Sequence, residues 1–234
     1  VVLAVWMSLR GPQPESVVDV ERLSRLATSL GDLAGFRSDA WFLPDEELLG
    51  FVEVPGGPFL MGSDPAIDPL AFDNEWWPGA RPQATLDLPS FYVGRYEVTV
   101  AQFAVFVEET GYRADDEAFQ PPPDHPVATV SWTDALAYAR WLETTLREWP
   151  DTPSELSRLL REGWRISLPT EAEWEKASRG SDGRVYPWGN APRQDRANYG
   201  GRGTAPVGSF DCPECPFGLL DMSGNVWELT RSPY

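Results

Sequence analysis

The stretch Phe217-Gly218-Leu219-Leu220-Asp221-Met222-Ser223-Gly224-Asn225-Val226-Trp227-Glu228 decides the fold assignment of this chain. It lies in the half that follows Gly180, where turn-forming phrases such as Tyr186-Pro187-Trp188-Gly189-Asn190 leave no segment long enough for a helix. Glycine, proline and asparagine favour turns because they fix or tolerate the backbone angles that turns need. We therefore expect loops and short strands from Gly180 onward.

Upstream of Gly180, four helix starts are predicted from one pattern. A hydroxyl residue is followed three positions later by an acid or glutamine, so each side chain can satisfy a free backbone amide at the helix terminus. The pairs are Thr99 with Gln102, Ser131 with Asp134, Thr152 with Glu155, and Thr170 with Glu173. Pro153 supports the third start, since proline suits the first helical position. The first, third and fourth helices are expected to end at Gly111, Gly163 and Gly180.

Short strands are predicted before the first of these helices. Residues 51–54 and 59–62 flank Pro55-Gly56-Gly57, which predicts a hairpin that opens the domain. Residues 63–83 follow neither helical nor strand periodicity, and we expect an ordered loop or a binding loop there. Residues 91–98 return to a strand pattern.

Composition narrows the range of possible functions. Of the 234 residues, 42% are hydrophobic and 24% are charged, as in a globular domain with an appendage. The 20 glycines, 23 prolines and 11 tryptophans indicate irregular segments that are held in place by packed aromatic side chains. The net charge of −17 repels phosphate backbones and argues against a nucleic acid partner. One histidine and two cysteines argue against catalytic zinc or iron, which usually takes two or three imidazole or thiolate ligands.

The first 45 residues are expected to form an arm ahead of the main domain. Residues 1–9 are uncharged and too few for a membrane span, which needs about 20 apolar residues, so they fit either the end of a membrane anchor or a buried strand. Apolar residues at helical spacing predict an amphipathic helix over residues 15–30. We therefore divide the chain into residues 1–45, the apolar segment with its helical arm, and residues 46–234, the main domain.

Six phrases that occur in order over about residues 51–230 resemble one family. They are Phe59-Leu60-Met61-Gly62-Ser63, Phe91-Tyr92-Val93-Gly94-Arg95-Tyr96-Glu97-Val98-Thr99, Pro126-Val127 with Val130-Ser131-Trp132, Leu168-Pro169-Thr170-Glu171-Ala172-Glu173-Trp174-Glu175, Tyr186-Pro187-Trp188-Gly189-Asn190, and the opening stretch. Each phrase alone is weak, but together they are similar to the formylglycine-generating-enzyme, or sulfatase-modifying-factor, domain. The resemblance implies an α+β, loop-rich variant of the C-type-lectin-like fold.

The resemblance bears directly on catalysis. Enzymes of this family oxidise a substrate cysteine to formylglycine with copper held by a cysteine pair, and relatives make sulfoxides with histidine-bound iron. The family's cysteine pair would lie downstream of Glu228, and this sequence ends at Tyr234 without it. We therefore expect the domain to lack its last strands, and we assign no catalytic residue and no copper site to this chain.

Cys212 and Cys215 lie upstream of that position. A lone Cys-x-x-Cys is compatible with a redox pair, half of a zinc site, a transplanted copper site or a small disulfide that staples a turn. Zinc lacks a second pair, and the flanking prolines and Gly218 do not favour the helix start of a thioredoxin-like motif. A structural disulfide, or an inert thiol pair, is the favoured interpretation.

The resemblance also implies a calcium site, since hard cations are held by carboxylates and backbone carbonyls. The family's ligands correspond to the Asp221 and Glu228 carboxylates and to the Gly224 and Val226 carbonyls. A weaker second site would use Asn198 and the Tyr199 carbonyl, but the glycines that follow offer it no acid. The alternative for the two acids is a hydrogen-bonded loop pair without metal.

These expectations favour a non-catalytic member of the fold. It would be a structural or interaction subunit outside the cytoplasm, associated with a membrane through its N-terminus, with protein partners or membrane-complex subunits and one bound calcium ion. One alternative is a copper-dependent formylglycine-generating oxidase seen in truncated form. Another is a display protein of the same fold whose variable face binds diverse ligands.

Overall fold

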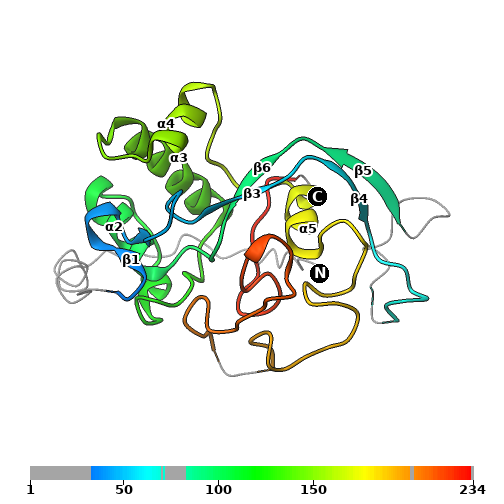
Figure 1. The fold of residues 1–234 in the computed structure, drawn as a ribbon. Helices are drawn as coiled ribbons and strands as arrows, with labels where there is room; N and C mark the ends of the chain where they lie inside the picture. Colours follow the sequence, from blue (N-terminus) through cyan, green and yellow to red (C-terminus); the bar gives the residue numbers. More distant parts are fainter. Residues whose placement is uncertain (1–32, 70, 72–82, 201–202, 233–234) are drawn as a thin grey trace.

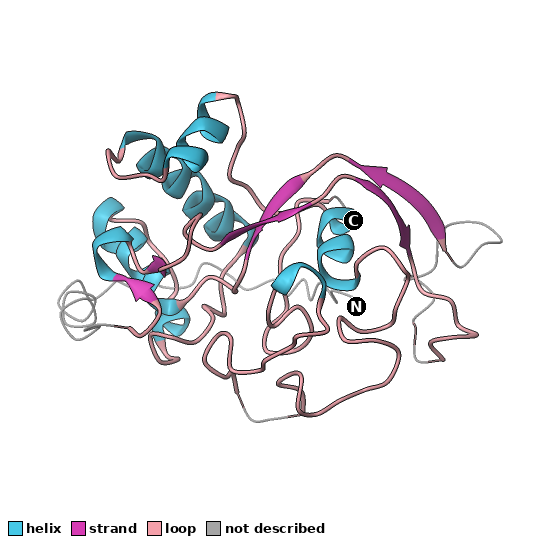
Figure 2. Cartoon of the chain, viewed as in Figure 1, coloured by secondary structure: helices cyan, strands magenta, loops and turns pink. Residues whose placement is uncertain are grey.

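The structure is a computed structural model that describes residues 33–69, 71, 83–200 and 203–232. The apolar segment at residues 1–9 and the helix expected over residues 15–30 lie outside the described residues, as does part of the loop at 63–83. Helices, strands and long loops together build the described part (Figures 1 and 2). Among these residues, no helix combines the length and apolar character that a membrane crossing requires.

A long antiparallel ribbon runs across the molecule in Figure 1. It consists of β3 (Phe51–Val54) paired with β6 (Phe91–Gly94), followed by β4 (Gly57–Met61) paired with β5 (Ala84–Leu88). The expected hairpin between residues 51–54 and 59–62 is therefore wrong, because the first strand runs on into the second and both pair with the returning chain. A smaller sheet joins β1 (Phe36–Arg37) to β2 (Leu43–Pro44).

Gly56 explains why the ribbon bends without turning back. A side chain there would place its Cβ 3.0 Å from the backbone nitrogen of Ser90, so any other residue would force the two strands apart by a few tenths of an ångström. The Gly56 amide donates to Ser90 Oγ at 2.9 Å, which replaces a ladder hydrogen bond at the break. The Pro-Gly-Gly phrase thus marks an interruption between paired strands, where glycine permits close backbone approach.

The only lysine of the sequence, Lys176, is buried beneath this break, with 3% of its surface exposed. Its ammonium group donates to the carbonyls of Pro55 and Gly57 at 2.7 and 2.8 Å. Burial lowers the pKa of this amine. The lysine therefore donates to carbonyls on both sides of the break.

Replacing Lys176 with alanine is expected to lower the free energy of unfolding by about 3 kcal/mol, because two partly buried carbonyls lose a charged donor. Urea unfolding of the wild type and of Lys176→Ala measures this difference. The exposed Arg161, changed to alanine, provides the control and should cost less than about 0.5 kcal/mol. Equal losses in the two variants would show that Lys176 does not hold the break.

Four α-helices are described: α2 (Val100–Thr110), α3 (Trp132–Glu148), α4 (Ser154–Arg161) and α5 (Glu171–Arg179). Capping boxes at Thr99, Ser131 and Thr170 confirm three of the predicted helix starts. The cap predicted at Thr152 is wrong, since its hydroxyl donates to the Leu146 carbonyl at 2.7 Å and Pro153 takes the N-cap position. Thr152 instead closes the preceding helix. The short helices are η1 (Ser38–Ala40), η3 (Asp116–Phe119) and η4 (Pro216–Gly218).

The helices and the ribbon enclose two main hydrophobic clusters. The larger cluster lies among α2, α3 and α4 and includes Phe103, Phe106 and Leu142. The smaller one packs the β3–β6 pair against α5 and η4. The described part of the predicted arm, residues 33–45, contributes Leu43 to the larger cluster and therefore packs on the domain.

Loops dominate after α5, as the sequence predicts. In the described residues beyond Gly180, η4 is the only regular element, and the short strands expected there are absent apart from an isolated bridge between Tyr186 and Gly189. Figure 2 shows these loops filling the region under α5. Positions in this region are therefore fixed by side-chain hydrogen bonds and glycines instead of by a sheet.

Candidate functional site

The loop at residues 221–228 has an unusual backbone. Asp221, Gly224 and Asn225 have φ angles of 58°, 94° and 59°. Left-handed angles are rare for residues with side chains, so this loop depends on contacts that over-determine it. Gly224 is required, because a Cβ at this position would lie 2.7 Å from the Asn198 carbonyl oxygen.

Two carboxylates of this loop are withdrawn from water. Asp221 is 7% exposed, and its Oδ2 accepts a hydrogen bond from the Gly208 amide at 2.6 Å. Burial raises the pKa of this carboxyl. Glu228 accepts a hydrogen bond from the indole nitrogen of Trp174. Burial, with a smaller contribution from Asp221, raises the pKa of Glu228 to about 7.

A third buried carboxylate, Glu97, was not among the predicted site residues. It lies between β6 and α2, is 9% exposed, and accepts hydrogen bonds from the Asn225 side-chain amide at 2.7 Å and the Val226 amide at 3.3 Å. Burial, followed by repulsion from Glu228 and Asp221, raises its pKa to about 9. An acid placed between Tyr96 and Val98, within a phrase predicted as a strand, is the signal that could have identified it.

The charges of these three acids are poorly compensated. None of them has a lysine, arginine or histidine partner among the described residues, and each lies where burial opposes ionisation. Uncompensated buried carboxylates either hold protons or bind a cation. The arrangement therefore suits a hard cation.

The predicted calcium ligands can be compared with this geometry. Within the described residues, no donor bonds to the carbonyl oxygen of Gly224 or Val226, so both remain available. The described residues contain no group of three His, Cys, Asp or Glu side chains that could hold an ion, so backbone oxygens would have to complete the set. Two carboxylates with two carbonyls are oxygen donors of the type that calcium takes. The ligand set of Asp221, Gly224, Val226 and Glu228 thus fits calcium and stays a prediction.

Asn198 has a structural part in the same region. Its carbonyl accepts the Asn225 amide at 2.9 Å, and its side-chain amide donates to Gly203 at 3.0 Å and Asn225 at 3.1 Å. Tyr199 is 46% exposed. The second calcium site at these two residues stays a prediction, and the hydrogen bonds show that Asn198 also fixes the first loop.

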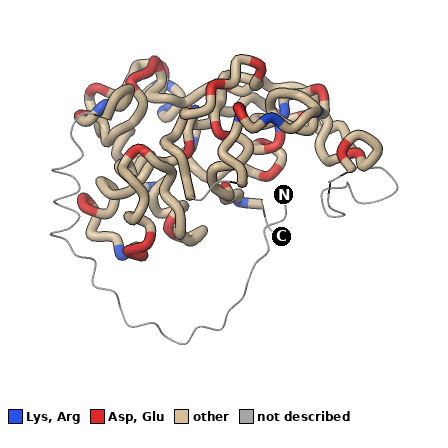
Figure 3. Tube along the Cα trace, turned by 90° about the horizontal axis from the view of Figure 1, so that it is seen from below, with Lys and Arg blue, Asp and Glu red and all other residues tan. Residues whose placement is uncertain are grey.

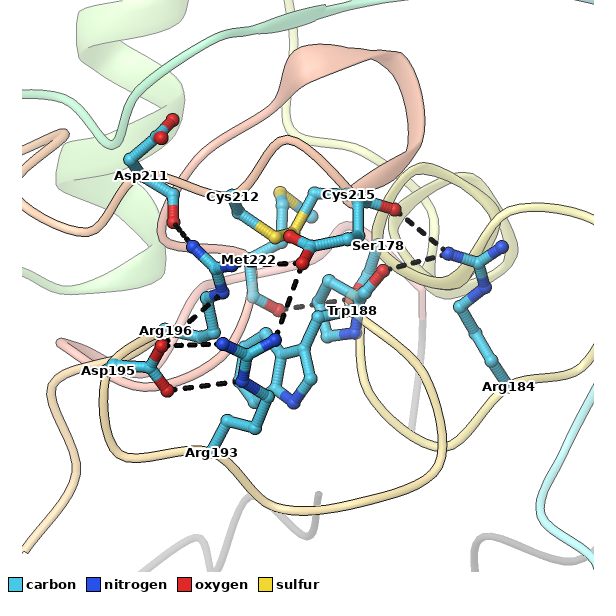
Figure 4. Close-up of a disulfide and its surroundings, with 12 residues drawn as sticks. Ser178, Arg184, Trp188, Arg193, Asp195, Arg196, Asp211, Cys212, Cys215 and Met222 are labelled. Carbon is cyan, nitrogen blue, oxygen red and sulfur yellow. Dashed lines mark hydrogen bonds and ion pairs between the residues drawn. A yellow bond between two sulfur atoms is a disulfide. The ribbon is translucent and has the colours of Figure 1, made fainter.

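Cys212 and Cys215 form a disulfide, with their Cα atoms 5.3 Å apart (Figure 4). These are the two cysteines of the sequence, so neither offers a free thiol in this state. The single histidine, His125, lies in a turn, where its Nδ1 forms a 2.8 Å hydrogen bond with Thr204 Oγ1. Soft sulfur is what selects Cu(I), and the donor set described here does not supply it.

An apolar cavity of about 290 Å³ lies beside the carboxylates. Residues from β6, α3 and the 220–229 segment line it, and Glu97 and Glu228 are among them. Trp227, which also borders the cavity, is 68% exposed. A large exposed indole next to an apolar hollow is suited to contact with another molecule.

Comparisons with known proteins agree with the sequence motifs. Residues 42–234 match the family described as sulfatase-modifying factor enzyme 1-like domain. The formylglycine-generating enzyme of Thermomonospora curvata is 33% identical over 79% of this chain and 72% of the relative. A protein of Bos taurus named inactive Cα-formylglycine-generating enzyme 2 is 30% identical over 91% of this chain and 79% of the relative.

Two further proteins are similar to this chain, one in sequence and one in structure. The hercynine oxygenase of Mycolicibacterium smegmatis is 34% identical over 78% of this chain, which spans 45% of that protein. The crystal structure of CarF matches with a TM-score of 0.50 and 26% identity over 79% of this chain and 80% of CarF. Together with the mixed helix and strand content, these similarities confirm the predicted loop-rich α+β fold.

Proposed function

Because this chain belongs to the family of sulfatase-modifying factor enzyme 1-like domains, we propose that residues 1–234 form a non-catalytic member of it. The domain would bind one calcium ion at the 221–228 loop and act as a structural or interaction subunit. We place it outside the cytoplasm, since disulfides persist in oxidising compartments. Association with a membrane through the N-terminal segment is part of the same proposal.

The Cys212–Cys215 disulfide is the observation that carries this proposal. Both cysteines of the sequence are used to close a four-residue turn, so neither provides a thiolate for Cu(I). A single histidine likewise falls short of the imidazole ligands that a non-haem iron site takes. The acids at the 221–228 loop are suited to binding a redox-inactive cation, which would neutralise their charge and hold the loop.

Surface properties support a role in binding. Acidic positions recur across the view in Figure 3, with few basic positions between them, in line with the net charge of −17. Such a field attracts cationic partners and accelerates their association. The exposed Trp227 beside the apolar cavity supplies a contact point for a protein partner.

Terbium luminescence tests the cation site, because Tb³⁺ replaces Ca²⁺ and is excited by nearby tryptophans such as Trp174. We expect one bound ion per chain, displaced by calcium. Asp221→Asn and Glu228→Gln should each weaken binding at least tenfold, whereas the matched control Glu148→Gln, an exposed acid on α3, should leave it unchanged. Equal behaviour of all three variants, or no luminescence, would remove the calcium part of the proposal.

The second candidate function is a copper-dependent formylglycine-generating oxidase. The 33% identity to the Thermomonospora curvata enzyme favours it. Oxygen consumption by copper-treated protein with a cysteine-containing peptide separates the two candidates. We expect neither turnover nor stoichiometric copper for residues 1–234; both together would establish the oxidase and reject the non-catalytic role.

A further inference from the structure

An arginine from an earlier loop donates hydrogen bonds to the turn that the disulfide closes. Arg196 donates from Nη1 to the Asp211 carbonyl at 2.6 Å and from Nη2 to Glu214 Oε1 at 2.9 Å. Asp211 directly precedes Cys212, and Glu214 lies inside the turn. Arg196 therefore binds on both sides of Cys212, and its two contacts require a fixed separation between Asp211 and Glu214.

Two more arginines bind the same turn. Arg193 pairs with Glu214 Oε1 at 3.3 Å, and Arg184 donates to the Glu214 carbonyl at 3.1 Å. In the view of Figure 4, Arg193 and Arg196 lie on one side of the disulfide and Arg184 on the other. Hydrogen bonds and ion pairs thus join residues 184–196 to the turn at several points.

Arg196 also links the disulfide-closed turn to the 221–228 loop, through the two residues that follow it. The next residue, Ala197, is 3% exposed, and Asn198 then accepts the Asn225 amide at 2.9 Å. A shift of Arg196 would move the two residues on which the 221–228 loop is packed. This connection uses only contacts within the protein and holds with or without a bound cation.

The two cysteine residues differ in exposure. Cys212 is 5% exposed, whereas Cys215 is half-buried. An incoming thiolate therefore reaches Cys215 first and releases the sulfur of Cys212.

We propose that the Cys212–Cys215 disulfide is a redox-sensitive clasp that keeps residues 193–198 in place. A dithiol reductant attacks Cys215, forms a mixed disulfide, and then closes its own disulfide. The S–S bond of the protein is broken, the two cysteines gain two electrons and two protons, and the dithiol loses the same number. Without the clasp, Asp211 and Glu214 are no longer held at the spacing that Arg196 needs.

Hydrogen exchange on the oxidised and dithiothreitol-reduced protein tests the proposal. We expect the amides of Cys215 and Arg196, which bond to the Cys212 and Arg193 carbonyls, to exchange at least tenfold faster after reduction. Amides of α3 serve as the internal reference and should not change. Equal protection of residues 193–198 in both states would overturn the clasp.

Single substitutions test separately the contacts of Arg196 and the reactivity of each cysteine. Arg196→Gln should loosen residues 193–198 in the oxidised protein, and the more exposed Arg193→Gln should do so less. In the single variants Cys212→Ser and Cys215→Ser, the remaining thiol should react with iodoacetamide at least tenfold faster when it is Cys215. A faster reaction of Cys212 would overturn the proposed order of attack.

Discussion

Replacing Gly224 with alanine is expected to lower the free energy of unfolding by about 4 kcal/mol, the largest effect of any single methyl group added to this loop. Two costs combine. A side chain at φ 94° is strained by about 1–3 kcal/mol. The added Cβ would also lie 2.7 Å from the Asn198 carbonyl oxygen, which cannot retreat without losing the 2.9 Å bond that it accepts from the Asn225 amide.

Gly163 provides the matched control for this substitution. Its φ angle of 101° is close to that of Gly224, and a Cβ there would meet no atom within 4 Å. Gly163→Ala therefore carries only the backbone strain, about 1–3 kcal/mol. Urea unfolding of both variants in the presence of a chelator isolates the steric cost without any cation effect. Equal losses would show that the contact with Asn198 contributes nothing.

The helices illustrate what local sequence determines. At Thr99, Ser131 and Thr170 the cap and its partner are three residues apart, so the interaction is complete within one turn and can be predicted from the sequence. Thr152 shows the same spacing but bonds instead to Leu146, on the helix before it. The Leu146 carbonyl, which the capping spacing does not include, therefore determines which hydrogen bond Thr152 makes.

The ribbon illustrates what local sequence leaves open. A Pro-Gly-Gly phrase is compatible both with a hairpin turn and with a break between paired strands. The choice depends on Ser90 and Lys176, which are distant in sequence and bind the chain at the break. Long-range contacts of this kind leave no periodic signal near residues 55–57.

The candidate site divides in the same way. Asp221 and Glu228 were predicted because they belong to one continuous motif. Glu97 was missed because its relation to the site exists only in space: its partner Asn225 is 128 residues away. Its burial, which the sequence does not show directly, is what makes it electrostatically important. The family resemblance thus led to the predicted loop, and the fold places a third buried acid beside it.

Glu97 and Glu228 lead to the second large effect: in a chelator, the protein is expected to lose stability as pH rises from about 5 to about 9. Both carboxyls have an ordinary pKa of 4.5, raised in the folded state to about 9 and about 7. The folded state therefore binds more protons than the unfolded state between these values. Since stability falls with pH wherever the folded state holds more protons, each carboxyl removes up to about 1.4 kcal/mol per pH unit.

Thermal unfolding at fixed ionic strength measures this dependence. Above about pH 8, Glu228 is largely ionised in both states, so the remaining decline comes from Glu97. Glu97→Gln removes that carboxyl while keeping an oxygen to accept the Asn225 hydrogen bond, and it should flatten the curve between pH 7 and 9. Glu148→Gln, an exposed glutamate on α3, should follow the wild type. A wild-type curve that rises from pH 5 to 9 in chelator would contradict the raised pKa values.

Calcium should reverse the trend, which links the titration to the cation site. Ca²⁺ binds ionised carboxylates, so each proton that leaves Asp221 or Glu228 improves its affinity, and bound ligand stabilises the folded state by mass action. The difference in Tm between calcium and chelator should therefore widen from pH 5 to pH 8. Glu228→Gln should abolish this widening. If the wild-type difference stayed constant with pH, the three acids would be coupled to one another but not to a cation, and the loop would be held by protons instead.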